Sequence, residues 1–147
     1  MSHTPEGQLF TDIVLEVFKL SGLLALEGDR ITDEFGLSSA RWKVLGALSF
    51  SPSPMTVPQI AAAMGQARQG VQRLVNEMRD DGFVVFQDNP YHKRAKLIAL
   101  TAKGKKTYER VDKKQIPWAN AIATGIKRSD LKTASAVLIK LIERLER

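Results

Sequence analysis

The segment 56–100 constrains the fold most, because its hydrophobic pattern changes from helical to extended spacing over a short length. Thr56 and Gln59 match a capping box, and Gly65 ends the short helix that they begin. A helix over about 67–80 follows at once, with apolar side chains at helical spacing: Val71, Leu74, Val75 and Met78. The pattern therefore predicts two consecutive helices joined by a tight turn.

Two apolar runs follow these helices, at residues 83–86 and 97–100. Their composition is typical of strands, and Asn89-Pro90 between them is a turn signal. The segment predicts a β-hairpin whose tip carries three cations and a histidine, namely His92, Lys93, Arg94 and Lys96.

Helical periodicity also flanks this segment on its N-terminal side. Residues 9–24 predict a first helix, which we expect to end at Gly28 before a loop over 28–37. A second helix begins at Ser38 or Ser39, either of which can serve as its N-cap, and ends near Phe50. The prolines of the segment 51–54 then require a linker.

Two further helices are predicted after the hairpin. Thr101 can cap the first of them, which we expect to kink or break at Pro117 and to end at Gly125. Ser129 opens the second, whose leucines form a seam that continues almost to the last residue. A homodimer that pairs the two ends of the chain would bury this seam, and packing against the first helix of the same chain is the alternative.

The composition narrows the class of protein. A length of 147 residues suits a single domain, and the absence of cysteine excludes disulfides, thiolate zinc sites, cysteine nucleophiles and thiol sensors. No apolar run approaches the ~20 residues of a membrane helix, and the polar N-terminus does not resemble a signal peptide. We therefore expect a cytoplasmic protein without a membrane partner.

Positive charge is concentrated in the middle and at the end of the chain. The net charge is +6, yet residues 1–65 hold 4 basic and 7 acidic side chains, whereas residues 66–106 hold 9 and 4. The outward face of the helix over 67–80 carries side chains that can pair with base edges: Arg68, Gln69, Gln72, Arg73 and Asn76. A phosphate-rich partner is indicated, and ordinary solvated helix faces are the alternative.

Catalysis is not supported by the sequence. His3 and His92 have no companion at metal-ligand spacing, and no glycine-rich phosphate loop follows a strand. The acids Glu77, Asp80 and Asp81 lie around the end of the helix over 67–80 and are more typical of a solvated helix end than of a catalytic pair. We predict neither an enzyme nor a cofactor or metal site.

The order of elements over 38–101 resembles a winged helix-turn-helix, and the sequence is similar to the MarR family of bacterial transcriptional regulators. Several pieces carry the resemblance in the right order: Ser38–Leu48 with its tryptophan, then Met64-Gly65, Val71–Val75 and Asp81–Val84, then Pro90, His92 and Arg94, and finally Leu100-Thr101-Ala102-Lys103-Gly104. It implies a mainly α fold with a small β-hairpin wing. The implied division is an N-terminal dimerisation helix over 1–37, a DNA-binding domain over 38–101 and C-terminal dimerisation helices over 102–147.

The resemblance also implies roles for the polar residues. The helix over 67–80 would enter the major groove, where Gln69, Gln72 and Arg73 would read bases, while Arg94 would reach the minor groove. Phosphate contacts would come from Arg68, Lys93 and Lys96, and His92 is either a backbone contact or a plain surface histidine. Two copies would bind a palindromic operator of double-stranded DNA with half-sites about one turn apart.

The sequence departs from the family pattern in two places. Ala67 stands where many members cap this helix with serine or threonine, and Arg68 is a possible substitute for the lost phosphate contact. Of the common Asp-x-Arg-Asp-x-Arg wing pattern, which would fall on Asn89 to Arg94, only the final arginine is present. Two of the usual wing contacts are therefore not expected in this chain.

The resemblance finally implies a repressor whose DNA affinity responds to a small aromatic or phenolic effector, bound between the dimer helices and the winged domain. Phe18, Trp42 and Tyr108 are candidates for lining that site, with plain core packing as the alternative for each. The alternative function is a winged-helix module that binds protein and not DNA.

Overall fold

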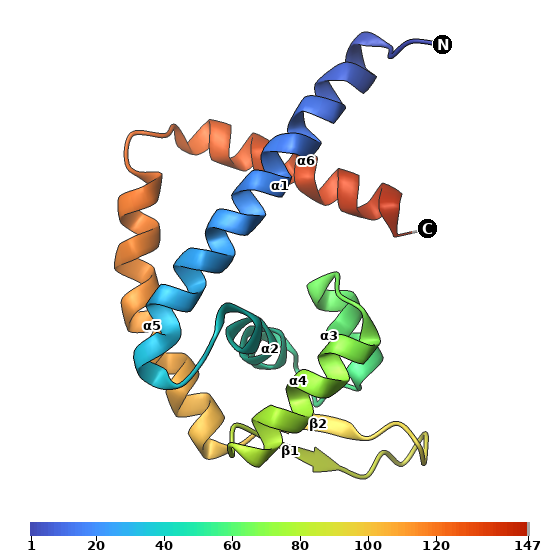
Figure 1. Ribbon diagram of the computed structural model, residues 1–147, viewed down its shortest axis with the longest axis vertical. Helices are drawn as coiled ribbons and strands as arrows, with labels where there is room; N and C mark the ends of the chain where they lie inside the picture. Colours follow the sequence, from blue (N-terminus) through green and yellow to red (C-terminus); the bar gives the residue numbers. More distant parts are fainter. Residues whose placement is uncertain (147) are drawn as a thin grey trace. The chain divides into compact units, whose positions relative to one another are not determined.

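The computed structural model describes residues 1–146, which divide into a compact unit over Met1–Lys113 and a second unit that begins at Lys114. The mainly α fold with a small hairpin is confirmed (Figure 1). The elements are α1 (Pro5–Thr32), the 3-10 helix η1 (Asp33–Phe35), α2 (Ser39–Phe50), α3 (Val57–Met64), α4 (Arg68–Asp80), β1 (Val84–Gln87), β2 (Leu97–Leu100), α5 (Ala102–Ala123) and α6 (Arg128–Leu145).

The helices of the central segment begin and end where local signals predict. Ser38 caps α2 by accepting a hydrogen bond from the Arg41 backbone, and Thr56 and Gln59 form the reciprocal capping box of α3. Gly65 follows α3 with φ 64°, in the left-handed region that favours glycine. Gly65 therefore sets the turn between α3 and α4.

A single core joins α2, α3, α4 and the hairpin. Each element contributes side chains that are almost completely buried, among them Val44, Leu45, Ile60, Val71, Val75, Met78, Phe83, Val84 and Ile98. On α4 these apolar residues lie on one side of the helix, so the opposite side must face solvent. Packing of the core therefore determines which face of α4 is exposed to solvent.

The hairpin is antiparallel and places Val84 opposite Leu100 and Gln87 opposite Leu97. Met55, just before α3, adds an isolated bridge to Ile98, with backbone hydrogen bonds of 3.1 and 2.7 Å. This bridge ties the base of the hairpin to the start of the helix pair. The sequence did not predict it, because a single bridging residue leaves no periodic pattern.

The prediction that Gly28 ends the first helix is wrong. The helix α1 runs from Pro5 to Thr32, and the turn comes at Gly36, whose φ is 71°. Gly28 has a packing role, since a Cβ added there would lie 2.7 Å from the Ser39 hydroxyl oxygen. The glycine permits α1 and α2 to approach closely, so it does not act as a helix breaker.

Two predictions for the C-terminal helices also need correction. The helix α5 continues through Pro117 to Ala123, so the proline does not end it. The next helix begins at Arg128 with Lys127 as its N-cap, and Ser129 lies inside its first turn. Gly125, with φ 85°, does mark the turn between them.

Apolar side chains remain exposed in both units. In the first unit, α1 exposes Leu9, Leu15, Phe18, Leu20, Leu23 and Leu26 among others. In the second unit, α6 has no buried residue and exposes Leu131, Val137, Leu138, Ile139, Ile142 and Leu145. Both surfaces are those assigned by sequence to dimerisation, and that assignment and its domain boundaries stay predictions.

Candidate nucleic-acid interface

The solvent-facing side of α4 carries the polar stripe that the sequence predicts. Arg68, Gln69, Gln72 and Arg73 are exposed and Asn76 is half-buried. The Gln72 side-chain amide donates a 3.0 Å hydrogen bond to the Asn76 side-chain oxygen. Because residues four apart lie on the same face of a helix, this bond aligns two amides along the stripe. Each amide keeps free donors or acceptors for a further partner.

The first turn of α4 has no side-chain cap. Ala67 occupies the N-cap position and makes no capping hydrogen bond. The first backbone N–H groups of the helix are therefore left to solvent or to an incoming acceptor. Arg68 follows directly, so positive charge and free N–H donors coincide at this end of the helix.

Hydrogen bonds within the tip of the wing, from both backbone and the Asn89 side chain, hold it in a turn. The Asn89 side-chain oxygen accepts a 3.0 Å hydrogen bond from the Tyr91 N–H, and its carbonyl accepts one of 3.2 Å from the His92 N–H. The His92 carbonyl in turn accepts from the Ala95 N–H at 3.3 Å. These turns hold Tyr91, His92, Lys93 and Arg94 in exposed positions.

Lys96 at the end of the tip is paired across the hairpin with Asp88. The hydrogen bond from Lys96, and then its positive charge, hold the pKa of the Asp88 carboxyl below its ordinary value. Both side chains are solvent-exposed, so a phosphate can compete for the lysine at little cost.

A groove of about 490 Å³ separates α4 from the wing. Five of the nine predicted DNA-binding residues line it: Arg68, Gln69 and Gln72 from α4, and Arg94 and Lys96 from the wing. Its apolar base includes Val57, Phe86 and Ile98. The remaining four, Arg73, Asn76, His92 and Lys93, lie outside this lining. Tyr91, which the sequence analysis did not single out, is 95% exposed at the tip.

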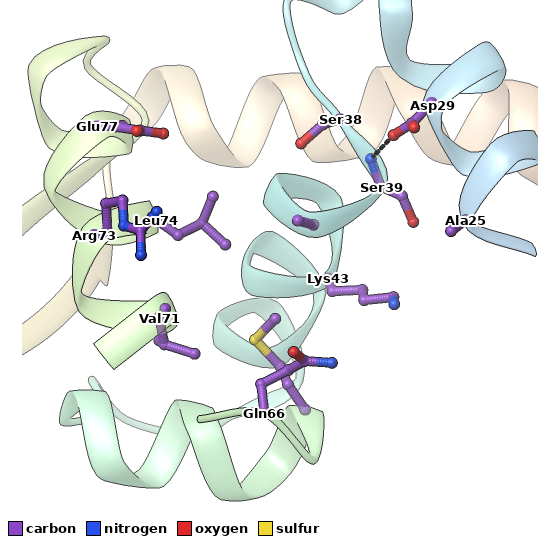
Figure 2. A pocket seen from close by; sticks show the side chains of 13 residues that line it. Ala25, Asp29, Ser38, Ser39, Lys43, Gln66, Val71, Arg73, Leu74 and Glu77 are labelled. Atoms are coloured by element: carbon purple, nitrogen blue, oxygen red, sulfur yellow. Dashed lines mark hydrogen bonds between the residues drawn. The ribbon is translucent and has the colours of Figure 1, made fainter. Parts of the chain in front are cut away.

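A second hollow of about 590 Å³ lies where α1, α2 and α4 meet (Figure 2). Ala25 and Asp29 come from α1, Ser39 and Lys43 from α2, and Arg73, Leu74 and Glu77 from α4, while Met64 and Gln66 precede α4. The Asp29 carboxylate accepts a 2.7 Å hydrogen bond from the Ser39 N–H, which links α1 to the start of α2. Lys43 and Arg73 make no ion pair within the described residues.

None of the three predicted effector residues lines this hollow. Phe18 is exposed on α1 and Trp42 is half-buried on α2. Tyr108 lines a different cavity of about 390 Å³, beside Pro52, Pro54 and Lys105, and its ring packs edge-on against Phe50. Burial, and then the charge of Asp112, raise the pKa of the Tyr108 hydroxyl. The assignment of these residues to an effector stays a prediction.

The described part of the chain contains no cluster of three or more side chains suited to a metal ion. Within residues 1–146 no helix has the length and apolarity needed to cross a bilayer.

Comparison with known sequences identifies the central segment. The model of the MarR family matches residues 35–95, which include α2, α3, α4 and the wing up to Ala95. The protein Rv2011c of Mycobacterium tuberculosis, itself uncharacterized, is 31% identical over 91% of this chain and 92% of its own length. The transcriptional activatory protein BadR of Rhodopseudomonas palustris is 23% identical over 95% of this chain and 82% of its own length.

Comparison with solved structures supports the same fold over nearly the whole chain. CouR from Rhodococcus jostii RHA1, solved bound to p-coumaroyl-CoA, matches with a TM-score of 0.79 and 21% identity. The match covers 89% of this chain and 92% of CouR. Sequence, fold and the winged arrangement of α4 agree: the chain belongs to the MarR family of transcriptional regulators.

Proposed function

We propose that the protein is a homodimeric regulator that binds a palindromic operator through α4 and the wing, and that it represses transcription until a small effector releases it. The observation that carries the proposal is the groove between α4 and the wing. Its walls bring amides and a cation from the helix opposite cations from the hairpin. Glutamine and arginine are suited to pair with base edges, and clustered cations to neutralise phosphates.

The roles of individual residues divide by position. Gln69, Gln72 and Arg73 are assigned to base edges in the major groove because they lie on the outer face of α4. Arg94 is assigned to the adjacent minor groove, because the ordered turn carries it out on the wing. Arg68, Lys93 and Lys96 are assigned to phosphates, and His92 is assigned to the DNA backbone.

The test is the affinity of the protein for a selected duplex, measured by fluorescence anisotropy over a range of salt concentrations. We expect Gln72→Ala to change the preference at one base pair, at a cost of about 1–3 kcal/mol in discrimination. Arg94→Ala should weaken binding to all sequences and make the salt dependence shallower by about one counterion. Lys132→Ala on α6 is the matched control for loss of charge, and it should leave the affinity, the base preference and the salt dependence unchanged.

Two outcomes would reject the DNA-binding assignment. One is a parent protein that ignores every duplex at low salt, which would favour the protein-binding module. The other is a pair of variants that bind all sequences as the parent does, which would show that α4 and the wing do not form the interface.

The hollow between α1, α2 and α4 is the proposed effector site. It lies between the predicted dimerisation helix and the winged segment, where the resemblance places the effector, although it is lined by other residues than those predicted. Its apolar surface suits an aromatic body, and Lys43, which makes no ion pair within the described residues, suits an anionic group. CouR, whose structure holds the aromatic thioester p-coumaroyl-CoA, supports an effector of this chemistry.

Benzoate and its uncharged analogue benzamide test this site. Benzoate at millimolar concentration should lower the affinity of the parent for its operator, whereas benzamide should not. Lys43→Met should abolish the response without changing affinity in the absence of benzoate. An equal response to both compounds would contradict the charge argument.

A reporter gene tests whether the protein represses or activates transcription. If expression is lost when the protein is deleted, the protein is an activator and not a repressor, as the name of BadR suggests for that relative.

A further inference from the structure

We propose that residues Asp81–Phe83, the α4–β1 joint, set the angle between α4 and the wing, and that Asp81 is the central positioning residue. The inference rests on the proposed function, because the angle matters only if both elements must fit one duplex. It assigns a role to residues that the proposed function does not place in contact with DNA. It also gives a role to Glu77 and Asp81, two charged residues near the end of α4 that do not line the groove.

The joint is short and its backbone is tied to α4. The helix ends at Asp80 and β1 begins at Val84, so three residues connect the two proposed DNA-contacting elements. Gly82 has φ 83°, and its N–H donates to the Arg79 carbonyl at 3.0 Å. The Phe83 N–H donates to the Met78 carbonyl at 2.9 Å. These bonds are those of a glycine-terminated helix and fix where the chain leaves α4.

From one direction the joint is held by α2. Arg41, in the first turn of α2, donates a 2.7 Å hydrogen bond from Nη1 to a carboxylate oxygen of Asp81. Its other terminal nitrogen lies 3.8 Å from a carboxylate oxygen of Glu77, one turn earlier on α4. The Arg41 side chain is only 18% exposed, so it has little freedom to move away. A planar guanidinium that spans two carboxylates fixes direction as well as distance.

From the other direction the joint is held by the start of α5. The Lys103 ammonium donates to the Asp81 carbonyl at 2.7 Å and lies 4.6 Å from the centre of the Phe83 ring. The Thr101 hydroxyl donates to the Gly82 carbonyl at 2.6 Å. Gly104 has no room for a side chain, because an added Cβ would overlap the Phe83 carbonyl oxygen. All three residues of the joint therefore have partners on α5 or just before it.

Asp81 is the residue at which both supports meet. Its carboxylate is bound by Arg41 and its carbonyl by Lys103, so α2 and α5 hold the two sides of one residue. If either support is removed, the angle between α4 and the wing can change. The helix and the wing then no longer fit the major and minor grooves of one duplex at the same time. The expected loss of affinity is then independent of any lost phosphate contact.

The test is a double-mutant cycle on affinity for the selected duplex. Arg41→Met and Asp81→Asn should each weaken binding about tenfold, and the double variant should bind no worse than either, because both break one interaction. The salt dependence should keep its slope in all three variants. Lys93→Ala, a proposed phosphate contact, should lower the slope by about one and serves as the contrasting control. Arg41→Lys should restore part of the affinity.

A second measurement follows the joint without DNA. Amide hydrogen exchange in β1 and β2 should accelerate in Asp81→Asn and Arg41→Met, while exchange in α3 stays at the parent rate. Additive losses of affinity, a shallower salt slope, or unchanged exchange in the wing would each overturn the proposal. A parent that binds no duplex would contradict the proposed function alone, since the exchange comparison would still decide the role of the joint.

Discussion

The winged segment and the terminal helices use their apolar residues in opposite ways. In the winged segment Leu45, Ile60 and Met78 are fully buried within one chain. In α6 and along much of α1 apolar side chains of the same kinds face solvent, as for Leu138 at 44% exposed and Leu15 at 62%. The first region completes its core alone, whereas the second leaves an apolar surface that a second copy can cover.

This difference assigns a different task to each region: the winged segment presents polar side chains, and the terminal helices join two copies of the chain. A surface that presents polar side chains in fixed directions needs a rigid support, which the core below α4 provides. The distance between the two α4 helices of a dimer, in contrast, is set by apolar surfaces that become buried only when two chains associate. The predictions below test this division, from the largest expected effect to the smallest.

The double variant Leu138→Glu, Ile142→Glu should weaken self-association by about 3–6 kcal/mol, since burying each such side chain contributes about 1.5–3 kcal/mol. Sedimentation equilibrium should show a shift from dimer to monomer. Lys140→Glu, between them on another face of α6, is the matched control and should remain dimeric. A double variant that stays dimeric would place the interface elsewhere.

Leu45→Ala should lower the free energy of unfolding by about 2–5 kcal/mol, because Leu45 is 0% exposed at the centre of the core. Urea unfolding followed by circular dichroism measures the change. Leu15→Ala on α1 should act mainly through association, so its effect should depend on protein concentration. A concentration-independent loss of similar size at Leu15 would contradict the contrast between the two regions.

Gly65→Ala should destabilise the protein by about 1–2 kcal/mol, because φ is 64° and a side chain is strained there even though nothing lies within 4 Å. Gly70→Ala is the matched control. It also has open space, but it lies within the helix α4, so alanine should stabilise by about 0.5–1 kcal/mol. Equal effects of the two variants in thermal unfolding would show that backbone conformation at the turn is not what matters.

Lys96→Met should raise the pKa of the Asp88 carboxyl toward its ordinary value, since Lys96 is the cause of the lowering. The pKa of Asp88 is lower in the folded state, so its contribution to stability is present above the ordinary carboxyl pKa. That contribution is lost as the pH falls through the lowered value. An NMR titration of Asp88 in parent and variant measures the shift. An unchanged pKa in the variant would mean that another group lowers it.

The elements of the winged segment could be predicted because their signals are local. Thr56 and Gln59 cap α3 from three residues apart, and the buried side of α4 follows from its own periodicity. Gly28 misled the prediction because the side chain that it accommodates, Ser39, lies eleven residues away in the sequence. A glycine that permits close packing cannot be distinguished from a helix breaker by its neighbours alone.

The candidate site shows the same limit. The polar stripe of α4 could be predicted, since one helix carries it. The groove could not, because it depends on how far Arg94 and Lys96 stand from Gln69. The pairing of Arg41 with Asp81 spans forty residues and leaves no periodic trace in the sequence. Contacts between distant elements decide these features, so only the folded chain reveals them.

Selection of duplexes from a random pool by the purified protein tests the central claim most directly. If α4 and the wing of two paired chains read DNA, the enriched sequences should form an inverted repeat with half-sites about one helical turn apart. A pool that shows no enrichment, or one that converges on a single unpaired half-site, would contradict the account.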